Sequence, residues 1–455
     1  MQTKETNKMG IKPVFPLLMS MAFPPMLSML IQSLYNIVDS VFVAQIGEQA
    51  LTAVSLAFPI QTLMIACSVG IGVGLNSYIS RKLGEKNIKE ANSAILHGLL
   101  LAFLGYLMFV VAGFFLIRPF FTMFTSDLVI LEQACTYTYI CVFFSFGCFL
   151  HICIEKVFQS TGKMIFPMAI QAIGAIINII LDPIMIFGYF GFPAMGVAGA
   201  AVATVIGQIF AGVLSLYILL TKEHDVKIDL NNFKFSKITT KKILLVAIPN
   251  ACMNALGSIL VIGLNAILIT FSNVAVAVFG IYFKLQTFVF MPASGLTQGA
   301  MPIFGYNYGA HYHERLVSTL KYSIIVTGVI MSCGTLLFLI LPEQLLSLFH
   351  ANAEMVAIGV PALRIIGISF IPATLGFVLP TLFQAIGLGI HSLLIFLLRQ
   401  LCITLPLSFV FAGPFGLVGI WSTFIIAESV AALVAVFMYF HIRKNDPILA
   451  KSQEA

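Results

Sequence analysis

Charged residues are scarce in this sequence of 455 amino acids. They make up 9% of the chain, whereas a soluble globular domain carries about a quarter. Hydrophobic residues make up 60%, and the mean hydropathy is +1.03. So little charge cannot cover the surface of a soluble protein of this size. The composition therefore predicts a polytopic membrane protein.

Cysteine is sparse as well. The eight cysteines lie in apolar stretches without paired C-x-x-C spacing, which argues against zinc and redox motifs. We expect them to be buried as small apolar side chains. A clustered nucleophile and base, or a set of metal ligands, is also missing from the expected helix ends. We therefore predict that the protein is not an enzyme and needs no cofactor or metal.

Apolar runs of about 20 residues, the length of a membrane-spanning α-helix, fill most of the chain. A transmembrane barrel would show short alternating segments instead. We predict an all-α membrane protein with twelve transmembrane helices, at about 14–44, 51–78, 93–117, 131–153, 164–188, 194–220, 243–271, 276–304, 317–341, 354–384, 390–412 and 416–441. Within the second helix, GIGVG (70–74) indicates close helix packing rather than a phosphate-binding loop.

A polar segment at 221–242 divides six predicted helices from six. We predict an N-terminal lobe at 1–220, a linker at 221–242 and a C-terminal lobe at 243–455. Most of the 24 lysines and arginines lie in the cytoplasm if both termini and the linker do, as the positive-inside rule requires. The net charge of +6 therefore reflects membrane topology and gives no reason to expect nucleic acid as a partner.

The two halves are related by an internal repeat. An offset of 225 residues aligns Pro24 with Pro249 and Gln61 with Gln286, among other pairs. An even number of helices in each half predicts two six-helix lobes related by a pseudo-two-fold axis along the membrane normal. The transport route is expected between the lobes.

An acidic residue interrupts the first apolar helix. Asp39 ends the segment QSLYNIVD (32–39), in which Gln32, Tyr35 and Asn36 share its helix face. On insertion scales, a carboxylate at the centre of a membrane span costs about 2.5–3.5 kcal/mol. Such residues usually face a partner or a cavity.

A second acid has the same setting, because Asp182 follows Asn178 by four residues in the fifth helix. Both helices run outward and both acids fall in the outer half, so they can share one pocket. We predict that Asp39 and Asp182 form a coupled proton or ion site with Asn178, Asn36 and Tyr35. The alternative is a structural pair that holds the two helices together by hydrogen bonds.

Pro24 and Pro25 fall inside the first predicted helix. Each ring removes a hydrogen bond to the preceding turn, so we predict a bend there. This bend is either static or the hinge of a transport cycle.

Four segments carry a resemblance to a known family: YNIVDSVFVAQIG (35–47), ISRKLGEKNIKEA (79–91), FQSTGK (158–163) and NIILDPIMIFG (178–188). On these motifs the chain resembles the multidrug and toxic compound extrusion (MATE) transporters of the DinF-like branch, over essentially all twelve helices. The resemblance implies two six-helix lobes and the export of bulky, often cationic compounds in exchange for protons or sodium ions.

The resemblance also implies roles for single residues. Asp39, Asn178 and Asp182 match the family's ion or proton site, and Pro24 matches the bend of its first helix. Polar and soft side chains are expected to line the substrate cavity: Gln32, Gln61, Thr204, Gln208, Gln286 and Met301. Of these, Thr204 and Gln208 lie near the expected contribution of the sixth helix.

The second half lacks both acids and carries other charges in its helices. These are Lys284, Arg364, Arg399 and Glu428, and Glu428 is expected to pair with Lys284 or Arg364. The three cations leave open a second interpretation, a lipid-linked oligosaccharide flippase of the same wider superfamily.

We predict a multidrug efflux antiporter that works by alternating access in the plasma (inner) membrane of a prokaryote. Its partners are expected to be small-molecule drugs or toxins and the lipid bilayer, and it is expected to function as a monomer. The choice between H+ and Na+ as the coupling ion stays open, as do the roles of the four charges in the second half.

Overall fold

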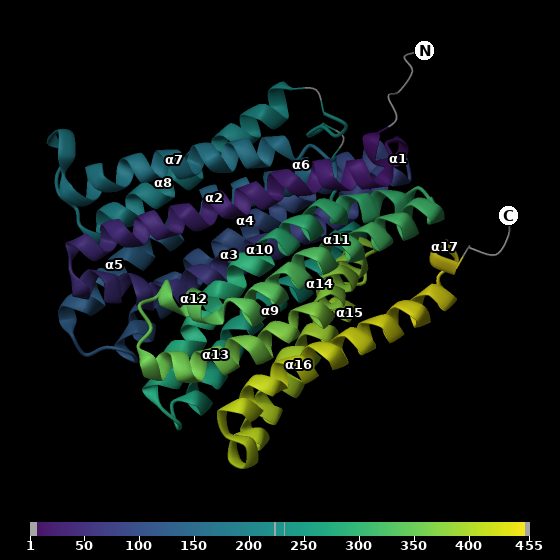
Figure 1. Ribbon diagram of the computed structural model, residues 1–455. Coiled ribbons are helices and arrows are strands. Elements are labelled where there is room, and N and C mark those ends of the chain that lie inside the picture. The colour runs from purple at the N-terminus through teal and green to yellow at the C-terminus, as the bar shows by residue number, and fades with distance from the viewer. Residues whose placement is uncertain (1–6, 223, 232, 451–455) are drawn as a thin grey trace. The chain divides into compact units, whose positions relative to one another are not determined.

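The computed structural model describes residues 7–222, 224–231 and 233–450 (Figure 1). In this part of the chain, all regular structure is helical. The elements are α1 (Lys8–Ile11), α2 (Val14–Ile46), α3 (Glu48–Gly84), α4 (Ile88–Thr122), α5 (Leu128–Phe143), α6 (Phe146–Ser160), α7 (Ile165–Phe187), η1 (Tyr189–Gly191), α8 (Val197–Thr221), α9 (Lys237–Leu268), α10 (Asn273–Gly309), α11 (His313–Ile340), α12 (Pro342–Ser347), α13 (Ala353–Ile368), α14 (Phe370–Ala385), α15 (Gly389–Leu397), the π-helix η2 (Leu398–Thr404), α16 (Leu405–Asn445) and α17 (Pro447–Ala450).

Nine helical stretches among the described residues are long and apolar enough to cross a membrane. Two bent pairs, α5 with α6 and α13 with α14, can each supply one more crossing. The stretch Gly389–Asn445 holds 57 residues, about 85 Å at 1.5 Å per residue, which is too long for a single crossing of a bilayer core about 30 Å thick. Gly416 divides it with a non-helical backbone (φ 56°, ψ −144°). Counting both sides of Gly416 gives twelve crossings, as predicted.

The two prolines at which a bend was predicted lie within α2. This helix is continuous through Pro24 and Pro25, and both rings are buried. Membrane helices tolerate proline because nearby groups satisfy the carbonyls that proline leaves without a donor. The role of these prolines as a hinge stays a prediction.

The helices form two packing units with boundaries inside α2 and α9. The first, which we call the N-unit, is Leu27–Ala251, and the second, the C-unit, is the chain up to Met26 together with the chain from Cys252 onward. The first part of α2 therefore packs in the C-unit, and the first part of α9 packs in the N-unit. The predicted lobes follow the sequence repeat, so these units differ from them at the first helix of each repeat.

We call the first parts of α2 and α9 the exchanged segments, because each packs in the other unit from the rest of its helix. Glycines let these exchanged segments pack closely. A Cβ added to Gly74 of α3 would clash with the carbonyl of Ile243 in α9, and both residues lie in the N-unit. A Cβ added to Gly299 of α10 would lie 2.7 Å from Ala22 of α2 in the C-unit. Gly74 and Gly299 are 225 residues apart, and the bounds of α10 are those of α3 displaced by the same offset. The repeat and the close packing at 70–74 are thus confirmed.

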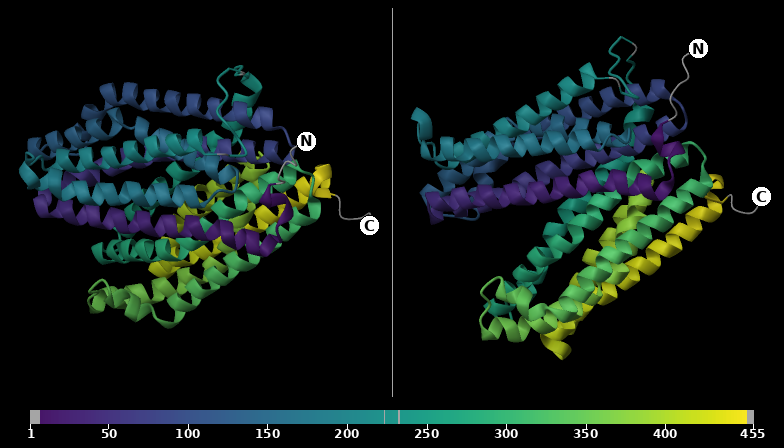
Figure 2. Two further views of the ribbon diagram at one scale, coloured as in Figure 1. Left: turned by 90° about the horizontal axis from the view of Figure 1, so that it is seen from above. Right: turned by 45° about the horizontal axis from the view of Figure 1, so that its top comes forward.

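The linker lies beside the start of α4 in the N-unit, where Figure 2 shows it in teal. His97 of α4 is fully buried and binds Ser236 of the linker. Its Nδ1 lies 2.8 Å from the carbonyl of Ser93, and its Nε2 lies 2.9 Å from the Ser236 backbone nitrogen. Since a carbonyl only accepts and an amide N–H only donates, His97 is neutral with its proton on Nδ1.

A second histidine, His224, fixes the start of the linker. Lys163 Nζ lies 3.1 Å from its Nδ1, and the carbonyl of Ile218 lies 3.0 Å from its Nε2. Burial lowers the pKa of His224, and the Lys163 ammonium lowers it further, while the Ile218 carbonyl acts in the opposite direction. The neutral form of His224 therefore holds the linker in place.

The prediction that all eight cysteines are buried is wrong for four of them. Cys67 is partly exposed, and Cys252, Cys333 and Cys402 are exposed. A protein surface that faces lipid is apolar, so a small apolar thiol needs no burial there.

Candidate functional site

The site is built on the close approach of α7 and α8 in the N-unit. Gly174 of α7 and Gly207 of α8 face each other, and a Cβ added to Gly207 would lie 2.9 Å from the carbonyl oxygen of Gly174. The same Cβ would lie 3.3 Å from the Cβ of Asn178. Two glycines therefore let the helix that carries Asn178 and Asp182 pack directly against α8.

Asn178 links Asp182 to α8. Both residues are buried, with 2% and 0% of their surface exposed. With its amide turned so that both polar atoms are satisfied, Asn178 Nδ2 donates to Asp182 Oδ2 at 3.0 Å, and its oxygen accepts from the Thr204 backbone N–H at 3.0 Å. The opposite orientation gives only longer contacts, 3.5 Å to Asp182 Oδ1 and 3.3 Å to the Thr204 hydroxyl. Asn178 is thus positioned to orient the Asp182 carboxyl group.

Asp39 and Tyr35 reach this cluster from α2. Asp39 is close enough to Asp182 for the two carboxyl groups to interact electrostatically. The Tyr35 hydroxyl hydrogen-bonds with Thr204 and interacts with both acids. Among the described residues, no hydrogen-bond partner reaches the buried Oδ1 of Asp39. The structure therefore brings Tyr35, Asp39, Asn178 and Asp182 together, as the sequence predicted.

Asn36 has a different position. It is exposed, and its backbone carbonyl accepts a hydrogen bond from the Ser40 hydroxyl at 2.8 Å. Among the described residues, no hydrogen bond joins the Asn36 side chain to either acid. Its assignment to the coupling site stays a prediction without support from this geometry.

The sequence reasoning missed two residues of α5. Gln61 of α3 donates from Nε2 to the Tyr137 hydroxyl at 3.3 Å and to Cys141 Sγ at 3.4 Å. Tyr137 and Cys141 are both buried, and both interact electrostatically with Asp39. Their spacing of four residues was the available signal, since it puts a hydroxyl and a thiol on one face of an apolar helix.

The predicted cavity residues divide between the two units. Gln32, Gln61, Thr204 and Gln208 lie in the N-unit, and Gln286 and Met301 lie in the C-unit. Gln171 of α7 donates to Gln32 at 3.1 Å, which ties α2 to α7 nearer to the N-terminal ends of both helices than the acids are. The assignment of these six residues to a substrate cavity stays a prediction.

The charges of the second half are arranged differently from the prediction. Glu428 pairs with Arg399, at 3.3 Å, and not with Lys284 or Arg364. Lys284 Nζ lies 5.9 Å from the ring centre of Phe349, and Arg364 donates to the carbonyl of Leu339 at 3.3 Å. The expected partners were wrong because helical spacing along a single helix does not reveal which other helix packs against it.

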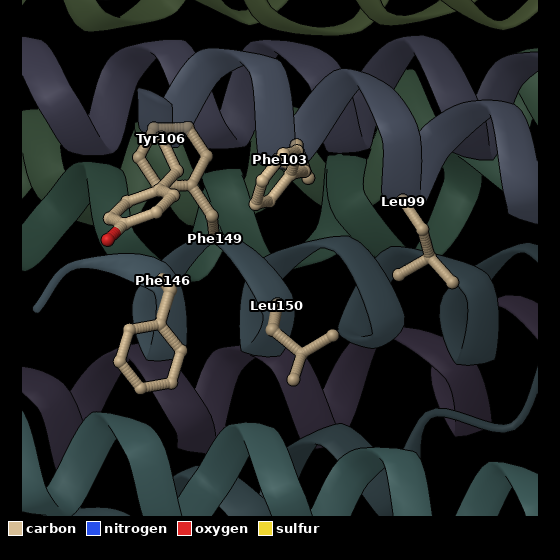
Figure 3. Close-up of a pocket in the computed structure, with 7 residues that line it drawn as sticks. Leu99, Phe103, Tyr106, Phe146, Phe149 and Leu150 are labelled. Carbon is tan, nitrogen blue, oxygen red and sulfur yellow. The ribbon is translucent and has the colours of Figure 1, made fainter. Parts of the chain in front are cut away.

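A pocket between α4 and α6 has a different character (Figure 3). Its volume is about 180 Å³, and it is lined by Leu99, Ala102, Phe103, Tyr106, Phe146, Phe149 and Leu150. The one hydroxyl in this lining, that of Tyr106, donates to the carbonyl of Phe143 at 3.0 Å. The lining contains no acid, so we do not assign this pocket to ion coupling.

The cluster can hold a small cation or a proton. Two carboxyl groups close together in a poorly solvated site cannot both be charged cheaply, so binding a proton or a metal cation relieves their repulsion. Tyr35 and Thr204 supply neutral hydroxyl oxygen atoms near the acids, and the Asn178 amide nitrogen donates to Asp182. Carboxylate and hydroxyl oxygens are suitable ligands for a hard cation as well as partners for a protonated acid.

Comparisons with known proteins extend over most of the chain. The family model described as MatE matches residues 24–184 and 249–410. The multidrug export protein MepA of Staphylococcus haemolyticus (strain JCSC1435) is 28% identical over 445 residues, which cover 95% of this chain and 94% of that relative. Among solved structures, an outward-facing multidrug resistance MATE family transporter of the MOP superfamily matches with a TM-score of 0.91 and 26% identity over 99% of this chain and 100% of that chain. A MOP superfamily transporter from Pyrococcus furiosus Vc1 (DSM3638) matches with a TM-score of 0.90 and 25% identity, with the same coverage.

Proposed function

Because this chain belongs to the MatE family, we propose that it is a multidrug efflux antiporter that exports amphipathic, cationic compounds in exchange for protons or sodium ions. The MepA relatives are named for multidrug export, and the match to them covers nearly the whole chain. The observation that supports ion coupling most strongly is the convergence of Asp39 and Asp182 around Asn178 in the N-unit.

The two acids act as one loading site for the coupling ion. Loading neutralises charge in a poorly solvated pocket and lets α2 and α7 repack, whereas release restores the charge. Pro24 and Pro25 lie at the end of the part of α2 that packs in the C-unit, next to the boundary at Met26. A bend at these prolines would couple loading in the N-unit to the position of that helix segment.

Antiport requires that the ion and the drug favour different states. A ligand shifts a conformational equilibrium only by its difference in affinity for the two states. The ion favours one state through Asp39 and Asp182, and the drug favours the other through the predicted substrate cavity. Alternating access follows from this difference.

We propose that the protein functions as a monomer in the plasma membrane of a prokaryote, with both termini in the cytoplasm. The cation bias of the sequence supports this orientation. A flippase would need exposed cations to hold a pyrophosphate group, and the pairing of Arg399 with Glu428 neutralises one of the three candidates. The geometry therefore favours the antiporter over the flippase.

Ethidium efflux from proteoliposomes tests the proposal. Purified protein is reconstituted, and efflux is compared under an imposed proton gradient, an imposed sodium gradient and no gradient. We expect efflux with at least one gradient and none without. Glu132→Gln is a control for the loss of a carboxylate outside the site, because Glu132 is exposed and pairs with Arg118. This variant should export ethidium as the wild type does. Equal ethidium retention under all three conditions would contradict the proposal.

A further inference from the structure

The C-unit contains a buried ion pair that the proposed mechanism does not use. Arg399 lies in the π-helix η2, and Glu428 lies in α16. Each side chain is 11% exposed. Charges inside membrane helices are costly and commonly mark functional sites, and short π-helical segments occur often at such sites.

The ion pair is held loosely. A single nitrogen, Arg399 Nη1, lies 3.3 Å from each of the two carboxylate oxygens. Charge-assisted hydrogen bonds are usually about 2.7–2.9 Å long, and arginine commonly binds a carboxylate with two nitrogens. The guanidinium also lies over the ring of Phe396, 4.6 Å from its centre. The Phe396 ring is therefore a second attractive partner of Arg399, one that does not depend on Glu428.

Aromatic side chains share the helix face of Glu428. Trp421 and Phe424 precede it by seven and four residues, on the same face of α16. Tyr282 of α10 packs edge-on against Phe424, with ring centres 5.7 Å apart. This combination of a carboxylate with aromatic rings is the chemistry that recognises organic cations.

Tyr282 supplies an unused polar group. Its side chain is 1% exposed, and it interacts electrostatically with both Glu428 and Arg399. Among the described residues, no hydrogen-bond partner reaches its hydroxyl. A buried hydroxyl without a partner is costly, so a group that enters beside Glu428 would find a ready partner there.

Gly376 of α14 keeps one side of the ion pair open. A Cβ at this position would lie 3.5 Å from both Arg399 Nη1 and Glu428 Oε2. Gly376 itself is half-buried. Any larger residue here would cover the charges, whereas glycine leaves them the small exposure that they have.

We propose that Glu428 recognises the positively charged group of a lipophilic organic cation, and that Arg399 occupies this position while the site is empty. This inference rests on the proposed function, since it identifies a specificity residue for cationic substrates. An entering cation takes the carboxylate, and Arg399 keeps its contact with the Phe396 ring. The displaced guanidinium remains close and repels the bound cation, so the site binds weakly and releases its substrate easily, as an exporter requires.

Equilibrium binding of ethidium to the purified full-length protein tests the proposal without any gradient. We expect Glu428→Gln to weaken binding at least tenfold, because the amide keeps the shape and removes the charge. We expect Arg399→Gln to tighten binding about three- to tenfold, because it removes the competing cation. Arg364→Gln is the matched control, since it removes an exposed cation of the same unit and should leave binding unchanged.

A double variant keeps the test decisive if Arg399→Gln fails to fold. Arg399→Gln with Glu428→Gln replaces the ion pair by two amides that can hydrogen-bond, and it should bind ethidium as weakly as Glu428→Gln alone. Equal weakening by Arg399→Gln and Glu428→Gln in folded protein would show a structural ion pair and overturn the proposal. Wild-type binding by the folded double variant would overturn it as well.

Failure here is distinct from failure of the proposed function. Wild-type export of ethidium together with unchanged binding by Glu428→Gln would overturn this inference and leave the antiporter intact. A different pair of results would contradict antiport but support the cation site. In this case Glu428→Gln loses ethidium binding, and the wild-type protein exports no ethidium under either gradient. Tighter binding of an anionic aryl sulfonate by Glu428→Gln, with ethidium unaffected, would assign the site to anions instead.

Discussion

Replacement of Gly207 by alanine should disturb the coupling site without touching an ionisable group. The new Cβ would lie 2.9 Å from the Gly174 carbonyl oxygen and 3.3 Å from the Asn178 Cβ, so α7 and α8 must separate by a few tenths of an ångström. Overpacking of this kind costs about 1–3 kcal/mol, and alanine regains about 0.5–1 kcal/mol over glycine in a helix. We expect a net loss of roughly 0.5–2 kcal/mol of stability.

The same separation should weaken the contact that orients Asn178. Its hydrogen bond to the Thr204 backbone N–H is 3.0 Å long, and a shift of a few tenths takes it beyond the usual range. Such a bond is worth about 1 kcal/mol, which corresponds to about a fivefold change in rate if it orients Asp182 for loading.

Gradient-driven ethidium efflux and thermal unfolding are the assays. Gly280→Ala is the matched control, because a Cβ placed there meets no atom of the described residues within 4 Å, apart from its chain neighbours and its own helix backbone. We expect this control to export at the wild-type rate and to be slightly more stable. Wild-type efflux and wild-type stability in Gly207→Ala would refute the reasoning that the two glycines set the position of Asn178.

Three further predictions concern other parts of the chain. Gly74→Ala and Gly299→Ala should each lower the unfolding temperature relative to Gly280→Ala, since each added methyl group meets a helix backbone; equal temperatures would contradict the packing of the exchanged segments. Asn178→Ala should reduce efflux more than Asn36→Ala. Of these two residues, Asn178 is the one that hydrogen-bonds to an acid in the site. A larger loss of efflux in Asn36→Ala would exclude Asn178 as the orienting residue. Because burial lowers the pKa of His224, the folded protein binds fewer protons there than the unfolded chain, and linker attachment should weaken as the pH falls below about 6.5. Hydrogen-exchange protection of residues 224–231, measured relative to the intrinsic exchange rate at each pH, should then fall at low pH in the wild type and show a flatter pH profile in His224→Gln. An unchanged profile in this variant would assign the effect elsewhere.

Much of the fold could be predicted because apolar runs and the repeat are properties of the linear sequence. The offset of 225 residues relates both ends of α3 to both ends of α10. The bend of 47° between α5 and α6 could not be predicted, because CVFFSFGC (141–148) contains no proline and its one glycine lies past the break. Packing against α3 and α8, rather than local sequence, fixes such a bend.

The packing of the exchanged segments could not be predicted from the sequence either. The sequence places Val14–Met26 next to the rest of α2, and only tertiary packing assigns it to the C-unit. Glycines four residues apart, at 70 and 74 and at 295 and 299, indicated that a helix packs closely on each of these faces. They could not show which helix it was.

The acids of the candidate site were visible in the sequence because a carboxylate in an apolar helix is rare. Asp39, Asp182 and Asn178 stand out for this reason, and the geometry brings them together. Tyr137 and Cys141 did not stand out, because tyrosine and cysteine are common in membrane helices and their neighbours come from α2 and α3. Contacts between helices distant in sequence need three-dimensional information.

The central claim is that Asp39 and Asp182 load as one unit. The most direct test measures ion uptake and ethidium efflux together in proteoliposomes that contain wild type, Asp39→Asn, Asp182→Asn or the double variant. Residues that act as a unit are strongly non-additive, so each single variant should abolish both fluxes as completely as the double variant does. All three variants should still bind ethidium within a few-fold of wild type. Efflux at the wild-type rate in either single variant, or losses that add in the double variant, would contradict the account.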